Sequence, residues 1–395
     1  MGSETATVRT VFHVMPHPGG GGETYVEALS RMDGYRFERA FVCPTQESEH
    51  RLTDALRALP RAGFGALRGA DVLHVHGEVA SALLLPAIAA RRSVVTLHGL
   101  NVVRRSSGAR RRVAEANLRL LVRAATRTIC VAEAERDDVL EVVGPEIAPR
   151  LALIHNGVDL FVPAGAFERA ATRELYDLPA EAVVGIYSGS LEQHKDPLAA
   201  ARATVEAAKD GSPLVLVIAG QGPLLSELER IAESAAPGTL RLIGQHADMI
   251  PILAAADFFV LPSLREGLSF SLLEAMSLGL APVVSDAPGN LEAVGEAALV
   301  VRRGDVAGYA AAFRRLLEDK AERVALGERA RTRVAQSFSA DEMVRRTHEL
   351  YDAVLETGSR RPPAAAAERD VAENLNPATF RPDGGSLRRE RPIGT

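Results

Sequence analysis

Cysteine is scarce in this chain of 395 residues. The two cysteines, Cys43 and Cys130, each lie within an apolar run and are far apart in the sequence. This pattern fits buried thiols in a reducing compartment better than a disulfide framework.

Long apolar stretches are also missing. No run reaches the ~18–20 residues that a membrane-spanning helix needs, and the N-terminus from Met1 to Thr7 is polar. Nothing here has the pattern of a signal peptide. We therefore expect a cytoplasmic protein.

The chain lacks an excess of positive charge, since its formal net charge is −5. That balance argues against a nucleic-acid-binding protein. The apolar fraction of 47% and the charged fraction of 25% are typical of a soluble enzyme. The length exceeds one ordinary hydrophobic core and predicts about two domains of ~150–200 residues.

Metal-binding motifs are absent as well. No Asp-x-Asp sequence occurs, and no group of cysteines and histidines has metal-ligand spacing along the chain. We expect no metal and no cofactor.

Short runs rich in Val, Ile and Leu alternate with helical patterns through most of the chain. The strands predicted in the first half are Val8–Val14, Phe37–Val42, Asp71–His76, Ser93–Leu97, Thr128–Val131 and Leu151–Ile154. Those predicted in the second half are Val183–Tyr187, Pro213–Ala219, Leu240–Ile243, Phe258–Leu261, Ala281–Val284 and Ala298–Val301. Nearly continuous apolar strands between amphipathic segments indicate an α/β fold with parallel sheets covered on both faces.

The alternation pauses once, at the turn sequence His155–Asp159 and the following stretch to Asp177. Beyond Val301 the pattern is helical, and Ser339 with Glu342 has the spacing of a capping box. We predict domains at 1–160 and 161–338 and a last helix at 339–357. The aperiodic tail, 358–395, is predicted to be disordered.

The most specific motif lies at Pro262–Met276, with the sequence PSLREGLSFSLLEAM. It follows a predicted strand and opens a helix near Ser269, whose free N–H groups form an anion site. Glu266 in the loop can reach a ligand there, and Glu274 can accept hydrogen bonds from a sugar diol. Two glutamates at this spacing are commonly solvated helix charges, but the strand, loop and helix around them favour a binding site.

This segment resembles the Glu-x7-Glu motif of the family-4 retaining glycosyltransferases, and the resemblance extends to about Leu355. It implies a GT-B fold of two facing Rossmann-like domains, with the last helix returning to the first domain. It also implies transfer of a sugar from a UDP-, GDP- or dTDP-linked donor to a hydroxyl acceptor, with retention of configuration and without metal.

The resemblance also implies ligand-binding roles for residues of this motif. The resemblance places Glu266 at the donor sugar and Glu274 at the ribose. Backbone groups that contact sugar and phosphate would come from Gly267, Leu268, Ser269 and Phe270, extending to Ser271. Ser269 and Phe270 depart from the family's usual glycine and small residue, which leaves the sugar's identity open.

A glycine run, PHPGGGGET, follows the first predicted strand. Glycines allow a phosphate or sugar to approach the backbone closely, although a plain flexible turn has the same composition. The run matches neither the P-loop nor the dinucleotide fingerprint. The resemblance implies that Gly21 and Gly22 face the donor.

The sequence SGSLEQHKD follows the first strand of the second half. Lys195, at the carboxyl end of a strand, suits an anionic ligand, although surface lysines are common. The family has Gly-Arg-Leu where this chain has Gly189, Ser190 and Leu191, and its arginine and lysine together neutralise the diphosphate. Ser190 therefore removes one expected phosphate contact.

The sequence Thr96-Leu97-His98-Gly99 ends another predicted strand and looks like the family's T-x-H-G element. In that element the histidine lies near the reacting sugar, so Glu266, Lys195 and His98 are the candidate catalytic residues. A lone histidine is more often structural. That reading applies to His74 and His76, which we expect to flank a strand.

Eight arginines lie between Arg104 and Arg127, on a predicted loop and basic amphipathic helix. Such a helix can rest weakly on an anionic membrane or contact a phosphorylated acceptor. A solvated helix face explains the same pattern.

Two other functions remain open at this point. One is a nucleotide-sugar epimerase or sugar-phosphate synthase on the same fold, and the other is a catalytically weak, sugar-nucleotide-binding homologue. The acceptor could be a specialised metabolite, a cell-surface glycan or a lipid-linked precursor, and the lack of a hydrophobic anchor favours the specialised metabolite. The sequence fixes neither the base, the sugar, the linkage nor the oligomeric state.

Overall fold

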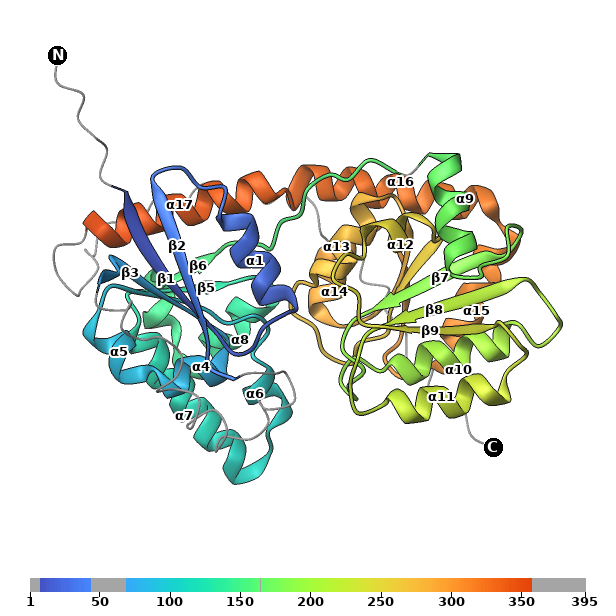
Figure 1. Ribbon diagram of the computed structural model, residues 1–395. Helices are drawn as coiled ribbons and strands as arrows, with labels where there is room; N and C mark the ends of the chain where they lie inside the picture. Colours follow the sequence, from blue (N-terminus) through green and yellow to red (C-terminus); the bar gives the residue numbers. More distant parts are fainter. Residues whose placement is uncertain (1–7, 44–68, 164, 357–395) are drawn as a thin grey trace, which may run out of the picture.

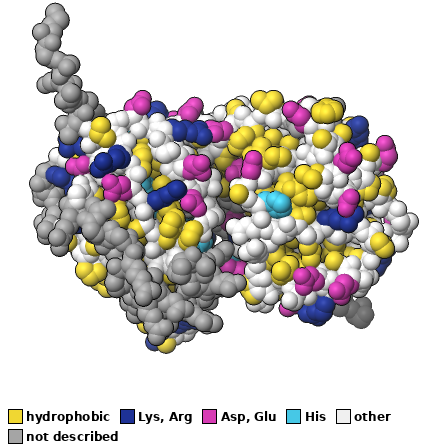
Figure 2. All heavy atoms as spheres, in the orientation of Figure 1, with side chains coloured by type: hydrophobic (Ala, Val, Ile, Leu, Met, Phe, Trp, Pro, Cys, Tyr) yellow, Lys and Arg dark blue, Asp and Glu magenta, His cyan; other side chains and the backbone are white. Residues whose placement is uncertain are grey.

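The computed structural model describes residues 8–43, 69–163 and 165–356. Two lobes stand side by side, and each is built on one twisted parallel sheet with helices on its faces (Figure 1). The face seen in Figure 2 is hollowed where the two lobes meet.

The first lobe holds a six-stranded sheet in the order β2-β1-β3-β4-β5-β6. All its strand pairs are parallel. The strands are β1 (Arg9–Met15), β2 (Tyr35–Phe41), β3 (Val72–His76), β4 (Ser93–Thr96), β5 (Arg127–Cys130) and β6 (Leu151–Leu153). Its helices are α1 (Gly21–Leu29), α4 (Glu78–Leu83), α5 (Leu85–Ala90), α6 (Asn101–Arg105), α7 (Gly108–Ala124), α8 (Glu133–Val143) and the 3-10 helix η3 (Pro145–Arg150).

The second lobe holds another six-stranded parallel sheet, in the order β12-β11-β10-β7-β8-β9. Its strands are β7 (Val183–Ser188), β8 (Leu214–Ala219), β9 (Leu240–Gly244), β10 (Phe258–Leu261), β11 (Ala281–Ser285) and β12 (Leu299–Val301). Its helices are α9 (Ala166–Leu175), α10 (Pro197–Ala207), α11 (Leu225–Ser234), α12 (Ile250–Ala254), α13 (Phe270–Ser277), α14 (Pro288–Val294), α15 (Val306–Glu318) and α16 (Lys320–Ser337).

The central strands are buried on both faces, which explains their unbroken apolar sequences. Every residue of β8 and of β10 is buried. Backbone polar groups are satisfied within the sheet while both rows of side chains pack against helices. The result is the Rossmann-like architecture that the sequence predicts for both halves.

The last helix, α17 (Ala340–Glu356), returns to the first lobe and runs along its edge in Figure 1. The Tyr351 hydroxyl lies 2.6 Å from His74 Nδ1 in β3, and the Tyr35 hydroxyl donates to Asp352 at 2.6 Å. The chain crosses between the lobes at two adjacent places, because Val158 pairs with Ser339 in an isolated β-bridge. The crossover helix is therefore confirmed.

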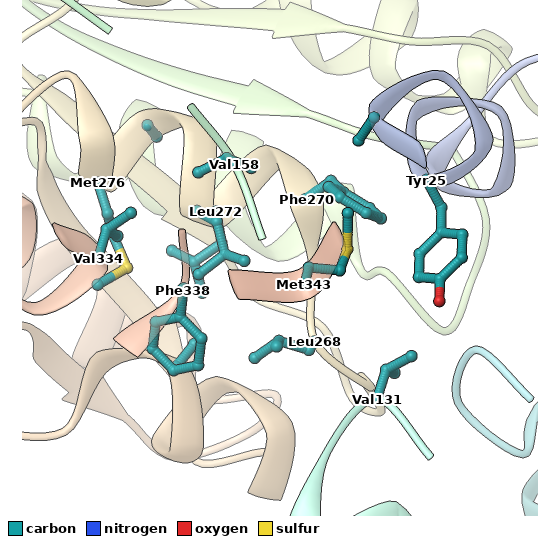
Figure 3. Close-up of a cluster of buried hydrophobic side chains, with 14 of the residues drawn as sticks. Tyr25, Val131, Val158, Leu268, Phe270, Leu272, Met276, Val334, Phe338 and Met343 are labelled. Atoms are coloured by element: carbon teal, nitrogen blue, oxygen red, sulfur yellow. The ribbon is translucent and has the colours of Figure 1, made fainter. Parts of the chain in front are cut away.

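A cluster of buried apolar side chains lies where the lobes and α17 meet (Figure 3). Tyr25 comes from α1, Phe270 from α13 and Met343 from α17, and all three are buried. This packing fixes the start of α13 against the first lobe. It therefore sets the distance across the hollow between the lobes.

All the strands predicted from apolar runs are confirmed, with ends that shift by one or two residues. His74 and His76, described above as flanking a strand, lie inside β3, in agreement with the predicted strand Asp71–His76. The domain limits at 160, 338 and 357 stay a prediction, and the tail 358–395 lies outside the described residues. None of the helices formed by the described residues is long and apolar enough to cross a membrane.

Candidate active site

The direction in which the chain adds strands to the second sheet reverses between β7 and β10. From β7 the chain builds outward to β9, then returns to the other side of β7 at β10. Loops leave the carboxyl ends of these two neighbours on opposite sides of the sheet, and open α/β sheets bind ligands at such a switch point. Lys195 follows β7 and Glu266 follows β10.

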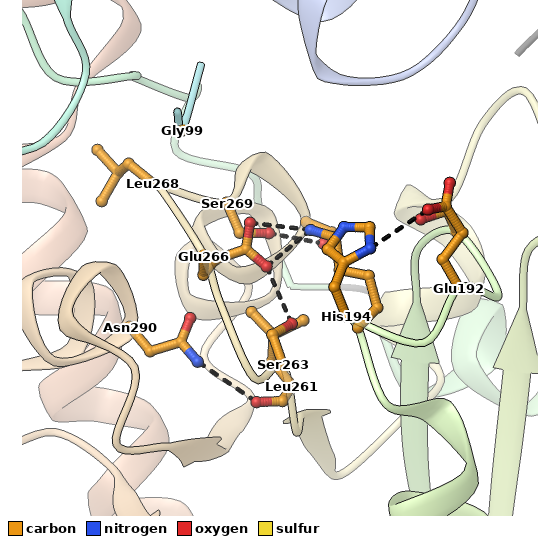
Figure 4. A network of polar contacts seen from close by, with 12 residues as sticks. Gly99, Glu192, His194, Leu261, Ser263, Glu266, Leu268, Ser269 and Asn290 are labelled. Carbon is orange, nitrogen blue, oxygen red and sulfur yellow. Dashed lines mark hydrogen bonds and ion pairs between the residues drawn. The ribbon is translucent and has the colours of Figure 1, made fainter. Parts of the chain in front are cut away.

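These two predicted site residues contact each other directly. The Lys195 Nζ donates to Glu266 Oε1 at 2.8 Å and to Oε2 at 2.7 Å. The Ser263 hydroxyl donates to Glu266 Oε2 at 2.9 Å, as Figure 4 shows from close by. The Glu266 side chain is 9% exposed and that of Lys195 is 21% exposed. The structure thus brings a carboxylate and an ammonium together at the switch point of the sheet.

Hydrogen bonds from Asn290 and Ser285 hold the loop that carries Glu266. The Asn290 amide donates to Leu261 O at 3.4 Å and to the Ser285 hydroxyl at 2.8 Å (Figure 4). The Ser285 hydroxyl in turn donates to Ser263 O at 2.5 Å. These bonds fix the loop in the position where the Glu266 carboxylate meets Lys195.

Gly289 is a supporting residue that the sequence analysis missed. A Cβ at Gly289 would lie 1.6 Å from Gly267 O, so only glycine allows α14 to approach the loop this closely. The signal was the Ala-Pro-Gly-Asn sequence directly after β11.

The loop after β7 is supported in the same way. A Cβ on Gly220 would lie 1.9 Å from Gly189 O, and the Gly189 N–H donates to Ala219 O at 3.1 Å. The Tyr187 hydroxyl donates to Ser190 O at 2.7 Å. The Gly220-Gln221-Gly222 sequence is the local signal of this packing, which was not predicted.

Helix α13 begins at the predicted place, with Ser269 as its N-cap. The side chains of Leu268 and Phe270 are buried in the apolar cluster, and the Asn156 amide donates to Leu268 O at 2.7 Å. Leu268 and Phe270 can therefore contact a ligand through their backbone N–H groups but not through their side chains. Such N–H groups at a helix start favour anions.

Glu274 lies farther along α13. Burial raises the pKa of Glu274 to about 7, and the nearby charge of Asp248 adds to the shift. Burial leaves the charged form of this half-buried carboxyl group poorly solvated, so hydrogen bonds donated by ligand hydroxyl groups would stabilise it.

The first lobe meets this loop at His98 and Gly99. A Cβ on Gly267 would lie 3.3 Å from Gly99 Cα and 3.8 Å from the carbonyl carbon of His98. His98 has the left-handed backbone angle φ of 56°, a strained conformation for a residue with a side chain. The Gly99 N–H donates to the buried carboxylate of Glu135, which holds this turn in place.

His98 belongs to a hydrogen-bonded group of histidines that includes His76, one of the two histidines expected to be structural. The His98 Nε2 lies 3.0 Å from His76 Nδ1, and His76 Nε2 lies 2.9 Å from His13 Nδ1. Strand register explains the meeting, because His13 pairs with His74 across β1 and β3. Spacing along the chain could not reveal a cluster assembled from two strands and the turn after a third.

The glycine run also differs from its predicted form. Gly21 and Gly22 are the first two residues of α1, and the turn itself is made by Gly19 and Gly20 at φ of 81° and 74°. A Cβ on Gly21 would lie 3.1 Å from the ring of Phe270. Gly21 thus allows the start of α1 to approach Phe270 at the start of α13.

Arg104 was predicted to lie on an exposed basic surface, but it is partly buried and hydrogen-bonded to other residues. Its Nε donates to Asp138 at 2.6 Å, and its Nη1 donates to Gly99 O at 3.2 Å and to Glu266 O at 3.4 Å. Arg104 therefore joins the two lobes behind the Glu266 loop. The exposed arginines of α7 are Arg110, Arg111, Arg112 and Arg123.

Two family models match the chain, one for each lobe. The model described as Glycosyltransferase Family 4 matches residues 10–161, and the model described as Glycosyl transferases group 1 matches residues 182–319.

Curated relatives include glycogen synthase of Mycobacterium tuberculosis, 30% identical over 354 residues, 86% of this chain and 82% of the relative. An Escherichia coli UDP-Gal:alpha-D-GlcNAc-diphosphoundecaprenol alpha-1,3-galactosyltransferase is 28% identical over 296 residues, 71% of this chain and 75% of the relative.

Solved structures share the fold at low sequence identity. Anabaena HepE in complex with UDP superposes with a TM-score of 0.70 at 18% identity, over 87% of this chain and 99% of that chain. Sucrose-phosphate synthase of Thermosynechococcus elongatus has a TM-score of 0.69 at 21% identity, over 87% and 98% of the two chains. The chain belongs to glycosyltransferase family 4, and it is a retaining enzyme of GT-B fold that transfers a sugar from a nucleotide sugar.

Proposed function

We propose that the nucleotide sugar binds across the carboxyl ends of β7 and β10. Glu266 contacts the sugar, Lys195 contacts the diphosphate, and Glu274 accepts hydrogen bonds from the ribose. The N–H groups at the start of α13 contribute the remaining phosphate contacts. The contact between Lys195 and Glu266 at the switch point of the sheet is the observation that carries this proposal.

The donor in this proposal is a UDP-hexose. A galactosyltransferase relative is named for UDP-Gal, and a structural neighbour was solved with UDP-glucose. A Xanthomonas campestris relative, 28% identical over 64% of this chain, is named for GDP-mannose, so the base needs a direct test.

The reaction breaks the bond between the sugar's anomeric carbon and the leaving phosphate oxygen. The acceptor hydroxyl attacks from the same face and forms the new glycosidic bond, and its proton passes to the departing phosphate. Lys195 and the amides of α13 stabilise the charge that develops on the diphosphate. This route retains configuration and needs no side-chain nucleophile.

The acceptor in this proposal is a lipid-linked, anionic molecule held at a membrane surface. The support is the outer side of α7, where the exposed Arg112 and Arg123 lie next to the exposed apolar residues Val113 and Leu120 in helical projection. Basic and apolar groups that neighbour each other on a helix fit a negatively charged bilayer surface. A soluble specialised metabolite would make no use of this face.

Two measurements test the proposed function. Thermal shift with a panel of UDP-, GDP- and dTDP-sugars should give the largest stabilisation with a UDP-hexose, since a ligand that binds only the folded state raises its stability. Sedimentation with vesicles should then show binding to phosphatidylglycerol but not to phosphatidylcholine, and Arg112→Glu with Arg123→Glu should abolish it.

Other outcomes have definite meanings. Release of free sugar and nucleotide without acceptor would favour an epimerase or synthase. Tight donor binding without turnover on any acceptor would favour a binding homologue. Equal binding to both vesicles would contradict the membrane-held acceptor.

A further inference from the structure

Three histidines form a hydrogen-bonded row inside the first lobe. His13 Nδ1 lies 2.9 Å from His76 Nε2, and His76 Nδ1 lies 3.0 Å from His98 Nε2. His13 and His76 are fully buried, and His98 is half-buried at the site. The row therefore connects the interior of the sheet with the residue that faces the second lobe.

All three rings are neutral at physiological pH. Burial lowers the pKa of His13 to about 3 and that of His98 to about 4. Burial and the neighbouring histidines hold the pKa of His76 well below its usual value. A neutral imidazole has one N–H donor and one bare nitrogen acceptor, so the two bonds of the row must run in the same direction.

Only two arrangements satisfy that rule. In one, protons sit on all three Nε2 atoms, and His98 turns a bare Nδ1 toward its open side. In the other, protons sit on all three Nδ1 atoms, and His98 presents an N–H there. His98 therefore offers the active site a hydrogen-bond acceptor in the first arrangement and a hydrogen-bond donor in the second.

The far end of the row discriminates between them. His13 Nε2 is buried and has no hydrogen-bond partner among the described residues. The first arrangement leaves a buried N–H unpaired at this atom, whereas the second leaves only a lone pair. Orphaned N–H groups are rarer in protein interiors than under-satisfied acceptors, which favours protons on the Nδ1 atoms.

We propose that His76 and His13 are positioning residues that hold His98 in the Nδ1–H form, so that His98 donates a hydrogen bond to an oxygen of the donor sugar. This inference rests on the proposed contact between Glu266 and the sugar, because the Glu266 loop meets His98 and Gly99 at Gly267. The Tyr25 ring packs edge-on against His98, with ring centroids 5.5 Å apart, and limits rotation of the imidazole. Hydrogen bonds in a row polarise one another, so the last donor is strengthened.

His74 is a natural control. It lies on the same strand and face as His76 and is equally buried. Its nitrogens, however, lie 2.6 Å from the Tyr351 hydroxyl and 2.7 Å from the Thr96 hydroxyl. Replacing His74 disturbs the same core without touching the hydrogen bond to His98.

A metal ion is the competing occupant of this cluster. Ring nitrogens of His13, His74 and His76 lie within 4.8 Å of one another. A metal would have to displace the bond between His13 and His76 and one of the bonds of His74. The ligand set would also leave the ion's charge uncompensated by a carboxylate, which is costly in a buried place.

The test is the tautomer of His98 in the ligand-free enzyme labelled with ¹⁵N-histidine. Two-bond ¹H–¹⁵N correlations distinguish Nδ1–H from Nε2–H, and loss of one ring's signals in His98→Gln assigns His98. We expect Nδ1–H in the wild type and in His74→Asn. We expect Nε2–H in His76→Leu, and a return to Nδ1–H in His76→Asn, whose amide nitrogen stands where Nδ1 stood.

Turnover then links the tautomer to the sugar. His76→Leu should lower kcat about tenfold, the worth of one neutral hydrogen bond, and His76→Asn should restore most of it. Nε2–H for His98 in the wild type would overturn the proposal, as would stoichiometric Zn²⁺ binding that requires His13 and His76. The expected tautomers with unchanged kcat in His76→Leu would overturn the contact with the sugar while leaving the tautomer assignment intact.

Discussion

The Lys195 ammonium lies within hydrogen-bond distance of both carboxylate oxygens of Glu266, at 2.8 and 2.7 Å. Both side chains are mostly shielded from water, so removing one partner leaves an uncompensated charge on the other. A diphosphate that binds at the switch point offers Lys195 a second anion. In this account the pair holds Lys195 in place until the donor arrives.

Glu266→Gln should cut turnover by about 10²–10³, and it should lower stability modestly because the mostly buried Lys195 ammonium loses its carboxylate partner. Steady-state kinetics with the preferred donor, together with a thermal melt, checks both parts. Glu296→Gln, an exposed glutamate of the same lobe, is the matched control. A Glu266→Gln enzyme within a few-fold of wild type would remove Glu266 from the site.

Glu274→Gln should stabilise the protein at pH 8 but not near pH 4. Burial raises the pKa of Glu274 to about 7 in the folded state, so ionising it costs stability as pH rises from its unfolded value through about 7. Glutamine removes that cost, and the gain at pH 8 should be about 3 kcal/mol. Denaturant unfolding of both proteins at the two pH values measures the difference. Equal stability at both would mean that Glu274 is not desolvated.

The same Glu274→Gln protein should bind the nucleotide more weakly, because an amide accepts hydrogen bonds from ribose less strongly than a carboxylate. Greater stability with poorer function is typical of a site residue.

Ser190→Arg should tighten binding of the free nucleoside diphosphate. The family's arginine is missing here, and the Tyr187 hydroxyl holds the backbone of residue 190 rather than its side chain. An added cation beside a diphosphate should contribute about 1 kcal/mol after desolvation, about fivefold in affinity. Calorimetry measures it, and an unchanged affinity would show that the diphosphate lies elsewhere.

Activity should survive EDTA. The sequence holds no Asp-x-Asp motif to position a cation on the diphosphate, and in the proposed donor site Lys195 and the α13 amides supply the positive potential instead. An assay after prolonged dialysis against chelator tests this. Complete loss that Mg²⁺ or Mn²⁺ restores would contradict it.

Local patterns predicted most of the fold. The apolar runs gave every strand of both sheets, and the capping spacing at Ser339 is realised by the Glu342 N–H, which donates to the Ser339 hydroxyl at 3.2 Å. The start of α13 at Ser269 was also predicted. These features depend on neighbours along the chain, which is why the sequence displays them.

Features that depend on long-range packing were not predicted. Arg104 reaches Glu266 O across 162 positions of sequence, although its surroundings resemble a solvated basic helix. The histidine row requires the register of β1 against β3, and no local spacing encodes it. The close fit of Gly289 under Gly267 likewise becomes visible only when the two loops meet.

The most direct test of the donor site is calorimetry of UDP with wild type, Lys195→Ala and Lys209→Ala. The chain has only three lysines, and Lys209 is an exposed residue paired with Glu206 in the same lobe. Loss of a hydrogen bond to a charged phosphate should weaken binding about tenfold or more in Lys195→Ala, with Lys209→Ala unchanged. Equal affinity for all three proteins would show that the diphosphate does not lie at Lys195, and the proposed donor site would be wrong.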